Sequence, residues 1–220
     1  MTDPIEDKPL DNQDDGDVAF ISAERVIFFS DAVVAIAITL LALGLPDVHG
    51  TSNAAVLRSL RANFDAYLPF VISFVVIAAY WRAHHRLYEY VARLDPRLVT
   101  INMVWLLMII CTPYATRVLS GGPFGGVRFS LYAVIQVITI LTLVIMRRHI
   151  LGAGLLRPDA PAAVAGTDDF SIVAVAATFA ISIPIAFIPA VGQWAYAVWA
   201  AAALVARSVR RARNRLAAGG

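Results

Sequence analysis

A short charged stretch stands at the start of the first long apolar run of the sequence. The run reads RVIFFSDAVVAIAITLLALGL over residues 25–45, and it carries the carboxylate of Asp31 inside it. A carboxylate inside a membrane is costly, so it is normally paired, hydrogen-bonded or protonated, and it often marks an ion or proton site. Asp31 is therefore the first candidate for chemistry, either as a proton or ion site or as part of a structural polar contact.

Side chains that suit Asp31 as partners lie in the segment YWRAHHRLYEY at residues 80–90. Trp81 can donate an indole N–H to a carboxylate, and His84 or His85 can donate a ring N–H. Arg25 lies about 120° away from Asp31 around a helix of 3.6 residues per turn. A partner on another helix is therefore favoured over Arg25.

The two adjacent histidines do not read as a metal site. Neighbours on a helix point about 100° apart, which is poor geometry for holding one ion. Neither a cysteine nor a third histidine stands nearby in the sequence. Ser30 and Asp31 are adjacent and lack a base placed to activate the hydroxyl, so hydrolase chemistry is not expected. The sequence therefore predicts neither a metal centre nor an enzyme.

The composition places these residues in a membrane protein. Of the 220 residues, 59% are hydrophobic and only 15% are charged, whereas a soluble domain carries roughly a quarter charged residues. The sequence predicts an all-α membrane protein with six transmembrane helices, because it has six apolar blocks that suit a bilayer. These blocks lie at residues 26–45, 66–83, 98–119, 129–146, 170–191 and 194–206, the last being short and expected to continue past Arg207.

The distribution of arginine predicts the orientation. We expect both termini to be cytoplasmic, because the loops on that side then hold the excess of positive charge. Residues 1–21 are expected to form a disordered acidic tail, residues 22–207 the six-helix membrane domain, and residues 208–220 a basic tail that anchors the chain or binds anionic lipid. The inner loops would hold Arg82, Arg86, Arg93, Arg97, Arg147, Arg148 and Arg157, and the outer loops Arg58, Arg61, Arg117 and Arg128.

Beyond Asp31 the first apolar run carries a stripe of large aliphatic residues. Ile36, Leu40 and Leu43 recur at spacings of four and three residues, so they share one face of a helix. Such a stripe usually packs against lipid or neighbouring helices. The alternative is that several copies of the chain bring the stripe together around a pore, where rings of aliphatic side chains narrow the path. Thr39 supplies the hydroxyl in the middle of this run.

Three segments carry a resemblance to a known family. RVIFFSD, followed by AVVAIAITLLALGLPDV, closely resembles the first helix of the prokaryotic transmembrane protein 175 family, which are relatives of the lysosomal potassium channel. YWRAHHRLYEYVARLD and INMVWLLMIICTPYAT are similar to later parts of that family's pattern. The resemblance covers most of residues 22–210. It implies a homotetramer whose first helix lines a central pore that passes potassium in preference to sodium, without a cofactor.

The resemblance also implies roles for individual residues. Ile36, Leu40 and Leu43 would form the pore constriction, and Thr39 would contribute to selectivity. The remaining matched positions would form a structural network that holds the first helix, and they are Arg25, Phe29, Ser30, Asp31, Trp81 and His84.

Residue patterns and resemblance together predict a potassium-selective channel that crosses the plasma membrane several times and conducts passively through a hydrophobic constriction. Its expected partners are potassium ions, membrane lipids and further copies of the chain, and no nucleic acid. One alternative is a proton-permeable channel or proton-coupled transporter that uses Asp31 with His84 or His85. Such transporters usually show internal repeats, and the two halves of this sequence do not match. The other alternative is a non-conducting membrane scaffold.

Overall fold

Helices make up almost all of the regular structure. The computed structural model describes residues 14–122, 124–161, 169–188, 194–195 and 198–199. Within these ranges there is no β-strand, and one isolated antiparallel bridge joins Val91 to Leu156. The prediction of an all-helical chain is therefore confirmed for the described residues. The helices are α1 (Asp14–Ala42), α2 (Asn53–Ala62), α3 (Phe64–Tyr88), α4 (Pro96–Ser120), α5 (Gly126–Gly152) and α7 (Asp169–Ala186).

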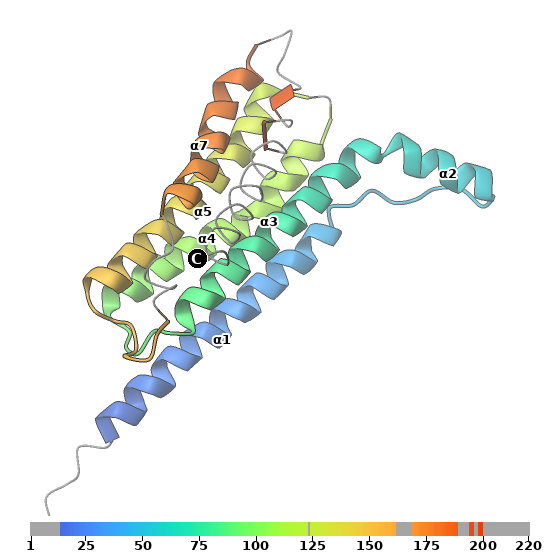
Figure 1. Cartoon of the computed structure of the whole chain (residues 1–220). Coiled ribbons are helices and arrows are strands. Elements are labelled where there is room, and N and C mark those ends of the chain that lie inside the picture. Colours follow the sequence, from blue (N-terminus) through green and yellow to red (C-terminus); the bar gives the residue numbers. More distant parts are fainter. Residues whose placement is uncertain (1–13, 123, 162–168, 189–193, 196–197, 200–220) are drawn as a thin grey trace, which may run out of the picture.

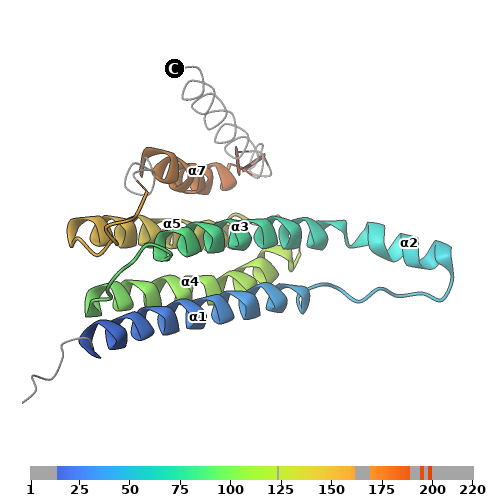
Figure 2. The ribbon, with the colours of Figure 1, turned by 60° about the horizontal axis from the view of Figure 1, so that its bottom comes forward.

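The long helices pack as a layered bundle (Figures 1 and 2). α1 lies against both α3 and α4, α4 packs on α5, and α7 covers α5 on the side away from α1. α2 is different, because it projects beyond the end of α3 and buries none of its residues against the bundle. The first helix is therefore held from one side only, by α3 and α4.

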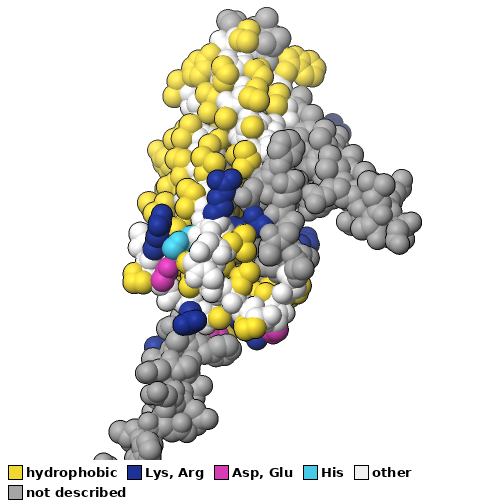
Figure 3. All heavy atoms as spheres, turned by 60° about the vertical axis from the view of Figure 1, so that its left-hand side comes forward, with side chains coloured by type: hydrophobic (Ala, Val, Ile, Leu, Met, Phe, Trp, Pro, Cys, Tyr) yellow, Lys and Arg dark blue, Asp and Glu magenta, His cyan; other side chains and the backbone are white. Residues whose placement is uncertain are grey.

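Four of the helices are long and apolar enough to cross a membrane. Figure 3 shows hydrophobic side chains over much of the described surface, while the charged side chains gather in the lower half of this view. An apolar exterior with a charged end is what a bilayer requires of its proteins. The four spans are Glu24–Ala42, Ala66–Tyr88, Pro96–Ser120 and Gly126–Gly152, and a shorter apolar helix covers Val173–Ala186.

The observed helices correspond to the first five predicted blocks, with differences at their ends. α1 begins at Asp14, inside the segment expected to be a disordered tail. The fifth block corresponds to α7, and the sixth, at residues 194–206, lies almost entirely outside the described residues.

α2 was not predicted, because a helix of ten residues with two arginines has no apolar run that a search for membrane spans would find. Local capping explains its start instead. The hydroxyl of Ser52 accepts a hydrogen bond from the backbone N–H of Ala55 at 3.2 Å, which satisfies one of the free donors at a helix beginning.

Asp95 joins the beginning of α4 to the end of α5. One of its carboxylate oxygens accepts a hydrogen bond from the backbone N–H of Leu98 at 2.6 Å, and the other lies 2.7 Å from Nε2 of His149. Pro96 follows in the first helical position, where its missing N–H costs nothing. The Leu98 N–H first, and then His149, hold the pKa of Asp95 below its ordinary value of 3.8.

Because folding lowers the pKa of Asp95, its carboxylate stabilises the folded state above pH 3.8, and this contribution is lost as the pH falls through the lowered pKa. The Asp95→Asn variant keeps a capping side chain but loses the charge. We expect this variant to have a lower apparent unfolding temperature than the parent in detergent near neutral pH. The difference in unfolding temperature between variant and parent should become smaller below pH 3.8.

Asp159→Asn is the matched control, since Asp159 is largely exposed and lies 3.5 Å from Nε of Arg157. A pH-independent loss in Asp95→Asn, or an equal loss in Asp159→Asn, would contradict the assignment.

Candidate functional site

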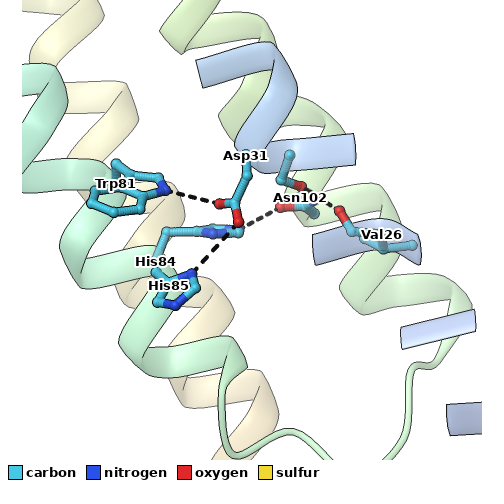
Figure 4. Close-up of polar contacts among 7 residues, drawn as sticks. Val26, Asp31, Trp81, His84, His85 and Asn102 are labelled. Atoms are coloured by element: carbon cyan, nitrogen blue, oxygen red, sulfur yellow. Dashed lines mark hydrogen bonds and ion pairs between the residues drawn. The ribbon is translucent and has the colours of Figure 1, made fainter. Parts of the chain in front are cut away.

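Polar side chains of α1 meet α3 and α4 near the charged end of the bundle, in a cluster that we call the clasp (Figure 4). Ser30 and Asp31 are neighbours on a helix, so their side chains point about 100° apart. Ser30 contacts α4, and Asp31 contacts α3. Two adjacent residues therefore attach α1 to two different helices. The clasp consists of Ser30, Asp31, Trp81, His84, His85 and Asn102.

The half of the clasp around Ser30 is completely buried. The Ser30 hydroxyl donates to the backbone oxygen of Val26 at 2.8 Å and accepts from Nδ2 of Asn102 at 2.9 Å. Oδ1 of Asn102 lies 2.8 Å from Nε2 of His84. Because this oxygen only accepts, the imidazole must carry its proton on Nε2. The amide of Asn102 thus bridges α1 and α3 from its position on α4.

Aromatic stacking fixes the imidazole of His84. Its ring lies between Trp105, at a centroid distance of 4.2 Å and an interplanar angle of 8°, and Tyr88, at 4.3 Å and 23°. Both neighbours are themselves buried. The ring can therefore present Nε2 to Asn102 in only one orientation.

The half of the clasp around Asp31 is partly exposed. Trp81 Nε1 donates to Oδ1 of Asp31 at 2.8 Å, and Nδ1 of His85 lies 3.6 Å from Oδ2. The side chains of His85 and Asp31 are 47% and 29% exposed. Water and salt weaken charge interactions at such exposure, so this half contributes less stability than the buried half.

The structure brings some of the predicted network residues together in the clasp and leaves others outside it. His85, and not His84, lies next to Asp31, while His84 reaches Ser30 through Asn102. Arg25 and Phe29 are exposed and lie outside the clasp, and the Arg25 side chain forms no hydrogen bond or ion pair with another described residue.

Asn102 was not among the residues predicted from the sequence. The available signal was that Asn102 is the single amide side chain in the apolar block at residues 98–119. Polar side chains inside a membrane helix normally find a partner on another helix, so this residue was a candidate for a contact between helices.

The aliphatic stripe lies on a different face of α1 from the buried half of the clasp, about 80–140° from Ser30 around the helix axis. In the single chain Ile36 is 59% exposed, Leu40 38% and Leu43 75%, whereas Val34 and Ala37 are buried against the bundle. The hydroxyl of Thr39 is exposed beside the stripe and donates to the backbone oxygen of Ile36 at 2.8 Å. α1 therefore has one face attached to the bundle and one that this chain leaves uncovered.

Ordinary catalytic or metal chemistry is not what this arrangement supports. Among the described residues there is no group of three or more His, Cys, Asp or Glu side chains that could hold a metal ion. Short hydrogen bonds join the buried side chains of the clasp across three helices, while Nδ1 of His84 makes no hydrogen bond. Fold and site together define a multi-pass, all-helical membrane protein whose first helix is hydrogen-bonded to two other helices of the same chain.

Comparison with known proteins identifies the family. The model of the family described as endosomal/lysosomal potassium channel TMEM175 matches residues 25–113. A potassium channel of Streptomyces collinus is 33% identical over 155 residues, which are 67% of this chain and 75% of that protein. The crystal structure of a lysosomal potassium-selective channel TMEM175 homologue from Chamaesiphon minutus matches with a TM-score of 0.63 and 25% identity, over 84% of this chain and 98% of that one.

The chain belongs to the TMEM175 family, as its first-helix sequence led us to expect. The family consists of ion channels and not of enzymes. Its members carry two kinds of name. The endosomal/lysosomal proton channel TMEM175 of Danio rerio is 23% identical over 103 residues, which are 46% of this chain but only 20% of that protein. The relatives from Streptomyces collinus and Chamaesiphon minutus are named potassium channels.

The two halves of the clasp predict different effects of substitution. Asn102→Leu keeps the size of the side chain but leaves Ser30 and His84 without their buried partner, and we expect a loss of about 2–3 kcal/mol in unfolding free energy. Trp81→Phe removes one bond at the exposed edge, and we expect a loss of about 1 kcal/mol. Denaturation by SDS in mixed micelles measures both, and a larger loss in Trp81→Phe would show that the exposed half holds the helix.

Proposed function

We propose that the chain is a potassium-selective channel in which α1 helices of a homotetramer line a central pore. The observation that carries the proposal is the uncovered face of α1, with Ile36, Leu40 and Leu43 exposed in the single chain. A different face of the same helix is attached by the clasp. The names of the bacterial relatives support potassium as the permeant ion.

The chemistry of the stripe limits the kind of selectivity. Aliphatic side chains cannot replace the water around an ion, so potassium would pass partly hydrated and discrimination against sodium would be modest. Thr39 offers the polar atom beside the stripe. Its proton is used in the bond to Ile36, so its oxygen lone pairs are free to accept from, or approach, a hydrated cation.

The clasp would determine which face of α1 reaches the pore. Arg25 and Phe29 lie on the exposed side of the helix with the stripe, since Arg25 and Ile36 are eleven residues apart and so within about 20° of each other around the axis. We therefore assign Arg25 and Phe29 to the pore mouth instead of the structural network. Ser30, Asp31, Trp81 and His84 remain in that network, joined by His85 and Asn102.

The loops on the clasp side carry the larger share of the arginines, which favours cytoplasmic termini. Several helices are apolar and long enough to span a bilayer, and we place the chain as a multi-pass protein in the plasma membrane.

Proton permeation is the second candidate function. The partly exposed pair of Asp31 and His85 favours it, because these are groups that exchange protons.

Ile36→Asn should raise the single-channel conductance in planar bilayers, because a polar ring at a hydrophobic constriction holds water and lowers the barrier to a hydrated ion. Leu107→Asn is the matched control, since Leu107 is an equally exposed aliphatic residue on α4. Unchanged conductance in Ile36→Asn tetramers, or an equal rise in the control, would remove Ile36 from the constriction.

Selectivity is measured separately, with potassium on one side of the bilayer and sodium on the other. We expect a reversal potential displaced in the direction of potassium preference, and only moderately so, because the permeant ion keeps part of its hydration. A reversal near zero would exclude potassium preference while leaving the pore itself in place.

A further inference from the structure

The short helix α2 stands at the end of the bundle opposite the clasp, where it buries none of its side chains. It ends at Asn63, whose side-chain Nδ2 donates to the backbone oxygen of Ser59 at 2.8 Å. α3 begins at the next residue, and Figure 1 shows α2 turned away from the line of α3. The membrane span within α3 begins at Ala66, four residues after the end of α2 at Ala62. α2 therefore leaves α3 at the level of the membrane surface.

The segment that precedes α2 covers one side of this helix. The backbone N–H of His49 donates to the hydroxyl of Ser59 at 3.1 Å. Gly50 has a φ of 120°, and a Cβ atom at this position would lie 2.5 Å from Cβ of Ala55. Ser59 and Ala55 each lie about 160° from Leu57 around the helix axis. The chain therefore covers the side of α2 that is turned away from Leu57.

The uncovered side of α2 carries large apolar side chains. Leu57 is 52% and Leu60 38% exposed, and their spacing of three residues places them on one face of the helix. The first turns of α3 also expose apolar side chains, since Phe64 is 63% and Leu68 46% exposed. Apolar side chains therefore point outward on both sides of the turn at Asn63, and burial of such surface is favourable.

The charges of α2 indicate what covers these leucines. The sequence NAAVLRSLRA of α2 contains two arginines and no acidic residue. Arg58 and Arg61 are exposed, and neither forms an ion pair or hydrogen bond with another described residue. They lie about 100° and about 40° from Leu57 around the axis, so they flank the apolar face. An arginine can extend its aliphatic stem along apolar surface while its guanidinium binds a phosphate.

This pattern fits a lipid surface better than a second copy of the chain. An apolar face flanked by basic side chains is typical of helices that lie in the membrane interface and are attracted by anionic lipids. Two copies of α2 would instead bring four arginines together without a carboxylate on either helix, and like charges oppose such a contact.

We propose that α2 lies on the membrane surface and binds anionic phospholipid. Leu57 and Leu60 insert at the boundary between headgroups and acyl chains, and Arg58 and Arg61 bind the lipid phosphates. The segment that covers Ser59 then faces the water. The interaction holds the end of α3 that lies away from the clasp, and it does not depend on which ion the protein conducts.

Fluorescent labels on two faces of α2 test its position in nanodiscs that hold the full chain. Leu57→Cys and Ala62→Cys are each combined with Cys111→Ala, which removes the single native cysteine. Ala62 is the matched control, because it is exposed and lies about 140° from Leu57. We expect lipids with a nitroxide near the headgroup to quench the label at Leu57 several-fold more than the label at Ala62. Iodide in the water should quench the two labels in the reverse order.

This order separates a helix on the membrane surface from one that stands away from it, because Ala62 is closer than Leu57 to the span of α3 along the chain. A label at Leu57 that iodide reaches as easily as the label at Ala62 would overturn the proposal. Protection of the Leu57 label from both iodide and nitroxide lipid would also overturn it, since a protein surface would then cover the leucines.

The preference for anionic lipid is tested in nanodiscs of phosphatidylcholine and phosphatidylglycerol. At the same mole fraction, nitroxide-labelled phosphatidylglycerol should quench the label at Leu57 about two-fold or more above nitroxide-labelled phosphatidylcholine. Arg58→Gln combined with Arg61→Gln should remove this excess. The matched control is Arg86→Gln combined with Arg93→Gln, which removes two exposed arginines at the clasp end of the bundle. Equal quenching by the two lipids, or an equal loss of the excess in both double variants, would refute binding of lipid phosphate by α2.

Discussion

The amide of Asn102 is the contact on which the arrangement of the bundle depends. It stands on α4 and bonds to both α1 and α3, through Ser30 and His84. A polar bridge has a fixed length and direction, whereas packed aliphatic side chains in a membrane allow helices to slide and rotate. The register and rotation of α1 therefore follow from this bridge, and the position of every side chain further along α1 follows from that rotation.

Polar and apolar side chains occupy different parts of the bundle. Polar groups are concentrated where three helices meet, at the clasp and at the cluster of Ser73, Thr116 and Tyr132. The uncovered face of α1 is almost entirely apolar. Buried hydrogen bonds in a low-dielectric interior are strong and specific, so they suit the fixing of geometry. An aliphatic surface binds no ion tightly, so it suits a path through which ions must also leave.

Much of the fold could be predicted from the sequence, because a membrane span is a long, simple signal. Four of the predicted apolar blocks correspond to spanning helices whose ends are shifted. α2 was not predicted, because an amphipathic helix of ten residues has no such apolar run. The clasp was only half predictable. Helical spacing favoured a partner for Asp31 on another helix over Arg25, and Trp81 was identified as one such partner. The choice between His84 and His85 depends on how α3 is rotated against α1, which no spacing within one helix contains.

The clasp lies near one end of a long helix that is packed against the bundle on one side only. A tilt of α1 about Ser30 would therefore displace the residues of the stripe. At a rise of 1.5 Å per residue, Ile36 stands about 9 Å and Leu43 about 20 Å from Ser30. A tilt of about 5° about Ser30 would thus move Leu43 by about 1.7 Å but Ile36 by less than about 1 Å. In the proposed pore, Leu43 at the far end of the stripe would therefore respond most to small changes at the clasp, and Ile36, nearest to the clasp, would respond least.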